Sequence, residues 1–236
     1  MDLLESWFKR VKVIGVTMVL SVASNMVAAG MIDKEGLRAW EICALCHSAD
    51  GVSRMAKFPK LAGQKAHYIE QQFIRFAQGS RQNGGGQMVA ITTEVENGDI
   101  SHIADYFSSL PADSLQVNVE AFDKAEKEWV TRGKQLFYHG KEGVTACAQC
   151  HTDKAASAPW IDRQHRDYLK KQLEDFASGE RATSVEDVAT VVRIKAYNSA
   201  AFSHAAVIMG DIAKRLSAAD INALSFYLSV TSIVRD

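Results

Sequence analysis

The chain of 236 residues contains an internal repeat, and this repeat constrains the fold more than any other feature. Segments 58–81 and 158–181 align without a gap at a constant offset of 100 residues. The residues that they share include Pro59/Pro159, Gln64/Gln164, Tyr68/Tyr168, Gln72/Gln172, Phe76/Phe176, Gly79/Gly179 and Arg81/Arg181. A further block, 88–110, matches 209–230. Self-similarity on this scale predicts two homologous domains.

A domain boundary is expected near Pro111, which would end the last helix of the first domain and is followed by a polar, irregular stretch. We therefore expect a first domain at 30–111, a linker at 112–119 and a second domain at 120–236. The fold class of both domains is predicted to be all-α, because apolar residues recur every three or four positions and strand-like alternation is nearly absent.

Three local patterns refine the helical prediction. Tyr68, Gln72 and Phe76, with their repeat partners, are expected on a middle helix, and Ser217 with Asp220 forms a plausible capping box. A short helix is also expected before each cysteine pair. It carries a glycine and an aromatic residue one turn apart, which would allow a crossing helix to approach closely: Gly36 and Trp40, then Gly133 and Phe137.

Residues 1–29 have the order of a secretory signal peptide, with basic residues, then a short apolar stretch, then small residues. Val27 and Ala29 fit the −3 and −1 positions of a cleavage site, so the mature chain is expected to start near Gly30. The alternative is an uncleaved membrane anchor, for which a spanning helix needs roughly 20 apolar residues. We expect export to the periplasm with cleavage.

Each half carries one Cys-x-x-Cys-His motif, and the two copies use all four cysteines: Cys43, Cys46 and His47, then Cys147, Cys150 and His151. A thioredoxin-like pair would need a βαβ context, and one shared zinc site would discard the repeat. Cysteines three residues apart on a helical turn can instead form thioethers with two vinyl groups of one porphyrin edge, while the histidine reaches the iron. This motif is the attachment signature of c-type haem, so we expect two covalently bound haem c groups.

The second axial ligand of each iron separates a carrier from a catalyst. Met88 and Met209 are the best candidates because they align in the repeat; the alternative is a pair of core methionines. From Arg81 to Met88 is 7 residues and from Arg181 to Met209 is 28, so the second domain has 21 extra residues. His204 lies in this insert and could replace methionine as the ligand.

The proximal histidines are expected to donate their second N–H to a backbone carbonyl, which fixes the ring orientation. Pro59 and Pro159 follow the two haem motifs and mark the loops where that acceptor is expected. The alternative is that each proline only starts the helix that follows it.

With these motifs the chain resembles the dihaem cytochrome c4 family. The resemblance rests on both haem motifs, on the stretch PKLAGQKAHYIEQQFIRFAQGSR and on the paired methionines, each followed by an ADYF or SFYL helix. It implies two class I cytochrome c domains related by a pseudo-twofold axis, with haem propionates near the interface. The chain departs from the family in its insert before Met209 and in the ten residues from Phe137 to Cys147, where Trp40 to Cys43 spans three.

The resemblance implies a periplasmic electron carrier, not an enzyme, acting between a cytochrome bc1-type complex or dehydrogenase and a terminal oxidase. Loose association with the inner membrane is also implied. One alternative is a haem-bearing subunit of a dehydrogenase complex, of the flavocytochrome sulfide dehydrogenase type, and another is a dihaem oxidoreductase such as a peroxidase. The formal net charge of −1 gives no electrostatic case for nucleic acid as a partner.

Overall fold

The computed structural model describes four stretches of the chain: residues 32–115, 117–152, 158–181 and 199–233. Every described residue belongs to one compact unit, and the predicted signal peptide at 1–29 lies outside the description. These stretches are helical and contain no strand, only an isolated bridge between Lys141 and Val144. No helix in them is long and apolar enough to cross a membrane. The prediction of an all-α fold is confirmed.

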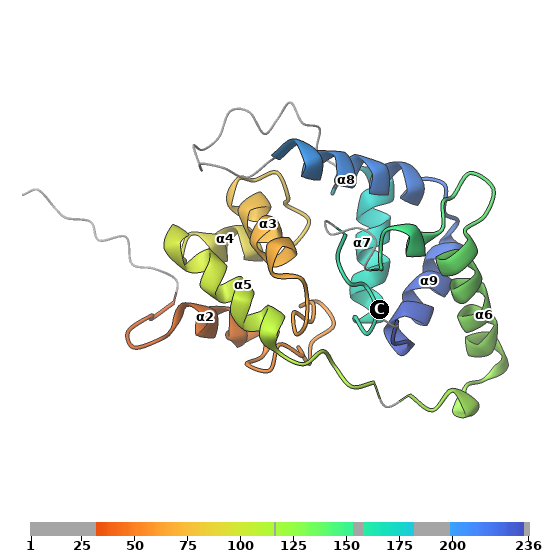
Figure 1. Cartoon of the computed structure of the whole chain (residues 1–236), viewed down its shortest axis with the longest axis horizontal. Coiled ribbons are helices and arrows are strands. Elements are labelled where there is room, and N and C mark those ends of the chain that lie inside the picture. Colours follow the sequence, from red (N-terminus) through yellow and green to blue (C-terminus); the bar gives the residue numbers. More distant parts are fainter. Residues whose placement is uncertain (1–31, 116, 153–157, 182–198, 234–236) are drawn as a thin grey trace, which may run out of the picture. The chain divides into compact units, whose positions relative to one another are not determined.

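The first half, residues 32–115, contains four α-helices and one 3-10 helix: α2 (Ala39–His47), α3 (Ala66–Ala77), α4 (Gln87–Thr92), η1 (Asn97–Asp99) and α5 (Ile100–Ser109). Figure 1 shows α3 beside α5. Ile69 from α3 packs there against Ile103, Ala104 and Phe107 from α5. The helix α5 ends two residues before Pro111, as the sequence predicts.

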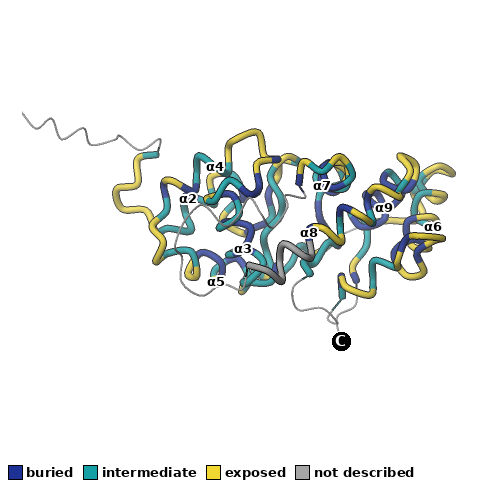
Figure 2. The backbone as a smooth tube through the Cα atoms, turned by 90° about the horizontal axis from the view of Figure 1, so that it is seen from above, coloured by how far each residue is buried: buried dark blue, intermediate teal, exposed yellow. Residues whose placement is uncertain are grey.

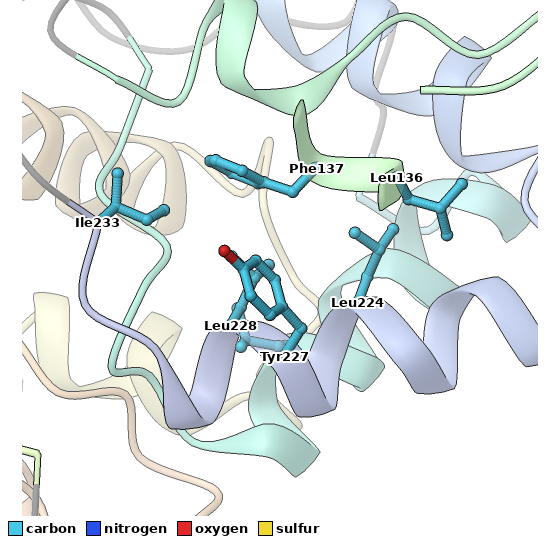
Figure 3. Close-up of a cluster of buried hydrophobic side chains, with 7 residues drawn as sticks. Leu136, Phe137, Leu224, Tyr227, Leu228 and Ile233 are labelled. Atoms are coloured by element: carbon cyan, nitrogen blue, oxygen red, sulfur yellow. The ribbon is translucent and has the colours of Figure 1, made fainter. Parts of the chain in front are cut away.

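The second half, residues 117–233, repeats this order with longer helices: η2 (Val119–Ala121), α6 (Lys124–His139), η3 (Cys147–Gln149), α7 (Arg166–Ser178), α8 (Ser199–Ala213) and α9 (Ala218–Val230). Its core lies between α6 and α9, where Phe137 packs near Tyr227 and Leu136 near Leu224 (Figure 3). Most of α9 is buried, whereas α6 is largely exposed (Figure 2). The predicted capping box of Ser217 and Asp220 starts α9.

The backbone itself repeats at the turn before the middle helix of each half. Gly63 has a φ of 67°, and Arg163, 100 residues later, has a φ of 59°. The Gly63 N–H donates to the carbonyl of Phe107 at 3.0 Å, and the Arg163 N–H donates to the carbonyl of Leu228 at 2.8 Å. The same turn therefore ties α3 to α5 in one half and α7 to α9 in the other.

The two glycines expected to permit close helix crossing behave differently. A Cβ added at Gly133 would lie 2.4 Å from the Ala223 carbonyl oxygen, so α6 and α9 can approach only because this residue is glycine. Gly36 lies outside α2, has a φ of 76°, and an added Cβ would meet nothing within 4 Å. The predicted helix crossing at Gly36 is wrong, because α2 begins only at Ala39.

Candidate haem sites

The first Cys-x-x-Cys-His motif forms the end of α2, so Cys43 and Cys46 lie about one helical turn apart. His47 is buried, and its Nδ1 lies 2.8 Å from the carbonyl oxygen of Pro59. A carbonyl only accepts hydrogen bonds, so Nδ1 carries the proton and Nε2 keeps its lone pair. Burial lowers the pKa of His47, although the bond to Pro59 opposes this shift, and the neutral imidazole is the metal-binding form.

The second motif has the same histidine geometry on a different backbone. Cys147 lies in η3, separate from α6, and Cys150 follows it. Nδ1 of His151 lies 2.9 Å from the carbonyl oxygen of Pro159. Burial lowers the pKa of His151, and the charges of Lys65 and Arg181 lower it further. Both predicted histidine–carbonyl contacts are thus present, while ligation of iron by these histidines stays a prediction.

The first cysteine of each pair lacks the lowered thiol pKa of a redox-active cysteine. All four are free of disulfides. Burial raises the pKa of the Cys43 thiol to about 12 and that of Cys147 to about 11, whereas redox-active cysteines need a lowered pKa. In the described stretches no three His, Cys, Asp or Glu side chains gather as metal ligands.

The candidate distal methionines lie on corresponding helices. Met88 is the second residue of α4, which packs on α3, and Met209 lies on α8, which packs on α7. Both are partly buried, and Met209 contacts the cluster of Phe176, Ala206 and Ala213. The insert lengthens this region, because α8 has 15 residues against 6 in α4. Residues 182–198 of the insert and the side chain of His204 lie outside the description, and ligation at both sites stays a prediction.

A cluster of buried polar side chains connects the two halves. Arg81 donates from Nη2 to the hydroxyl of Tyr168 at 3.2 Å and to Oε1 of Gln172 at 2.9 Å. Arg181 donates from Nη2 to the hydroxyl of Tyr68 at 2.9 Å and to Oε1 of Gln72 at 3.3 Å. Each half thus makes the same contacts to the other, which is the arrangement that a twofold axis produces.

This cluster is strongly positive for a buried region. Burial alone would raise the pKa of Tyr168, but the charges of Arg81 and Arg181 outweigh it and lower that pKa. Nε of Arg181 is buried and has no hydrogen-bond acceptor among the described residues. Buried charges require partners, and each haem brings two propionates. Together with the two Cys-His sets, these residues fit two haem c groups.

Comparisons with known proteins agree with this fit. Residues 130–232 match the family model described as Cytochrome c. The chain is 32% identical over 194 residues to cytochrome c4 of Pseudomonas aeruginosa, an alignment that covers 79% of this chain and 82% of that protein. It is 26% identical over 194 residues to a thiosulfate dehydrogenase electron acceptor of Stutzerimonas stutzeri, covering 79% of this chain and 77% of that one.

The fold has a close match among solved structures. Reduced recombinant cytochrome c4 from Pseudomonas stutzeri superposes with a TM-score of 0.61 at 29% identity, covering 81% of this chain and 94% of that one. This match confirms the predicted fold class, a tandem pair of class I cytochrome c domains. The boundaries at 30–111, 112–119 and 120–236 stay predictions.

Proposed function

Because the chain belongs to the cytochrome c4 family, we propose that it is a periplasmic dihaem carrier working between a respiratory donor and a terminal acceptor such as an oxidase. Family membership itself makes it an electron-transfer cytochrome with covalently bound haem c. The bound haem supplies a reversible one-electron change at iron. The observation that carries the proposal is the matched pair of buried histidines whose Nδ1 atoms face the carbonyl oxygens of Pro59 and Pro159.

We assign the roles at each haem by the repeat. The thioethers form at Cys43 and Cys46 for the first haem and at Cys147 and Cys150 for the second; the iron ligands are His47 with Met88 and His151 with Met209, and His204 is the alternative to Met209. A thioether ligand raises the reduction potential relative to a second histidine. Two protein ligands at each iron would leave no open position for a substrate, so we propose no enzymatic activity for the chain.

We place the protein in the periplasm, with residues 1–29 removed as a signal peptide and with peripheral association at the inner membrane. The order of charged, apolar and small residues supports export. The proposed donors are a cytochrome bc1-type complex or a dehydrogenase, and the proposed acceptor is a terminal oxidase.

A second candidate function is that of a haem-bearing partner of a dehydrogenase complex. It is favoured by the similarity to proteins named thiosulfate dehydrogenase electron acceptor in Stutzerimonas stutzeri and Thiomonas intermedia, each 26% identical to this chain. Stopped-flow reduction of the oxidised protein by purified dehydrogenase and by a bc1-type complex distinguishes the donors. The faster donor at equal concentration is the one to retain.

The assignment of the distal ligands is tested by optical spectra and a redox titration of the whole protein. Met209→Ala should abolish the ferric charge-transfer band of a methionine-ligated second haem and lower its potential, and Met88→Ala should do the same at the first haem. Met55→Ala is a matched control, because Met55 is 55% exposed and lies only eight residues after His47 in the sequence. An unchanged band in Met209→Ala would show that the ligand there is another residue. Rapid carbon monoxide binding by the reduced wild type would contradict the carrier function.

A further inference from the structure

Each half of the molecule holds the loop that orients the histidine of the other half. The side-chain amide of Gln64 donates from Nε2 to the carbonyl of Trp160 at 2.9 Å and accepts at Oε1 from the N–H of Trp160 at 3.0 Å. Gln164 does the same to Lys60, donating to its carbonyl at 3.0 Å and accepting from its N–H at 2.9 Å. Lys60 and Trp160 are themselves 100 residues apart, so the two contacts are reciprocal.

The N–H that each glutamine binds belongs to a particular peptide group. The N–H of Trp160 and the carbonyl of Pro159 are the two ends of one planar peptide, and that carbonyl faces Nδ1 of His151 at 2.9 Å. A continuous chain therefore runs from His151 through this peptide to Oε1 of Gln64 in the other half. The corresponding chain runs from His47 through the Pro59–Lys60 peptide to Gln164.

Each glutamine side chain is also held by a hydrogen bond within its own half. Oε1 of Gln64 also accepts the N–H of Lys65 at 3.0 Å, and Oε1 of Gln164 also accepts the N–H of His165 at 3.0 Å. Only 8% of Gln64 and 9% of Gln164 is exposed. The position of each acceptor is thus set by the start of its own middle helix, so a displacement of that helix is passed to the other half.

We propose that Gln64 and Gln164 are crossed positioning residues: Gln64 sets the orientation and basicity of His151, and Gln164 sets those of His47. Hydrogen bonds in a chain polarise one another, so an acceptor on the peptide N–H makes the carbonyl a stronger acceptor for the imidazole N–H. A more strongly bound imidazole proton makes the ring a better electron donor to iron, which favours the ferric state. The proposal rests on the proposed roles of both histidines as iron ligands.

The alternative is a purely structural role, in which these hydrogen bonds only hold the two halves together. The control for this alternative is Gln72, which is also buried at the interface and whose Oε1 accepts from both Arg81 and Arg181. Gln72 lies outside the two chains that lead to the histidines. Loss of Gln72 should weaken the interface and should not affect one histidine more than the other. Loss of Gln64 should affect the second haem alone.

The test uses the full-length dihaem protein, with Gln72→Met as control. Gln64→Met and Gln164→Met keep side-chain length and remove both hydrogen bonds to the other half, together with the bond from the N–H of Lys65 or His165. Hydrogen exchange measured by mass spectrometry gives the exchange rate of the peptides that contain Trp160 and Lys60. In Gln64→Met the N–H of Trp160 should exchange about fivefold faster, as expected for a lost bond of about 1 kcal/mol, while the N–H of Lys60 is unchanged. Gln164→Met should give the reverse pattern.

A redox titration then separates positioning from packing. Gln64→Met should raise the potential of the second haem and leave the first unchanged, with the two waves assigned from a single-haem protein lacking Cys147 and Cys150. Equal shifts of both waves, or the same pattern in Gln72→Met, would overturn the proposal. The amide exchange rates and the two potentials can be measured without the physiological donor or acceptor. Failure of the proposed electron-carrier function can therefore be told apart from failure of this proposal. Gln64→Glu provides the second variant, because it keeps the acceptor at Oε1 and loses only the donor at Nε2. The Trp160 N–H should then keep its slow exchange and the potential of the second haem should not rise, so a rise would overturn the proposal.

Discussion

The two halves of the molecule share one fold but stabilise it differently around their first helix. In the first half α2 has 9 residues, carries the haem motif itself, and packs through Trp40 stacked on Tyr106 with ring centroids 3.9 Å apart. In the second half α6 has 16 residues, ends before the motif, and crosses α9 in direct contact at Gly133. The second half has the larger of the two clusters around these helices, so we expect the first half to depend more on its haem.

The largest difference is expected when each haem is removed separately. The first-half cluster contains four buried residues, Ile69, Ile103, Ala104 and Phe107, against seven in the second-half cluster. Replacing Cys43 and Cys46 by alanine should therefore unprotect the amides of α2 and α5, whereas replacing Cys147 and Cys150 should leave those of α6 and α9 largely protected. Amide exchange by mass spectrometry measures both. Equal loss of protection would show that the halves depend on haem equally.

The next effect concerns Asp220, whose carboxylate caps the last helix of the second half, whereas the last described helix of the first half has no such cap. The Asp220 side chain is fully buried at the start of α9, where it accepts from Arg132 at 2.6 Å and Lys141 at 2.8 Å as well as from Ser217. Asp99, at the matching position, makes no side-chain cap bond. Asp220→Asn should cost about 3 kcal/mol of unfolding free energy at pH 7, and Asp99→Asn close to nothing.

The pH dependence of Asp220 has a definite sign. Burial alone would raise its pKa, but the bonds from Lys141, Ser217 and Arg132 outweigh burial and hold the pKa below its ordinary value. A carboxylate with a lowered folded pKa adds stability that is fully present above the unfolded value of about 3.9 and is lost as the pH falls below it. Denaturant unfolding at pH 7 and pH 3 should show wild type and Asp220→Asn converging at the lower pH. A constant gap would contradict this account.

Much of this difference could be predicted from the sequence, because helix periodicity, the capping box and the haem motifs are local signals. The wider spacing from Phe137 to Cys147 was visible only as a departure from the family, and the structure shows that the second motif starts in η3, separate from α6. The prediction for Gly36 failed because a glycine pattern does not report where a helix starts.

Contacts between the halves could not be predicted in the same way. Self-comparison singled out Gln64 and Arg81 because their partners at 164 and 181 are identical. It cannot tell whether a repeated residue serves its own domain or reaches into the other, since both cases leave the same identities. Only the distances to Trp160 and Tyr168 show that these side chains act across the interface.

A smaller effect should separate the two glycines. Gly133→Ala puts a methyl group 2.4 Å from the Ala223 carbonyl oxygen, in backbone that cannot move aside easily, so about 2 kcal/mol of unfolding free energy should be lost. Gly36→Ala meets no neighbour, and its positive φ should cost about 1 kcal/mol. Denaturant unfolding of the holoprotein gives both values. A larger loss at Gly36 would mean that α2 depends on its entry turn more than α6 depends on its crossing.

The smallest effect should come from the aromatic stack that replaces a long first helix in the first half. The rings of Trp40 and Tyr106 are nearly parallel, with an interplanar angle of 12°, and the Tyr106 hydroxyl donates to the carbonyl of Ala49 at 2.7 Å, just after the haem motif. Trp40→Leu keeps an apolar side chain but removes the stack, so we expect a loss of about 1 kcal/mol in the unfolding free energy. Tyr106→Phe keeps the stack and removes only the bond to Ala49. If Tyr106→Phe proved more damaging than Trp40→Leu, the hydroxyl bond to the motif loop, and not the stack, would be what anchors α2 on α5.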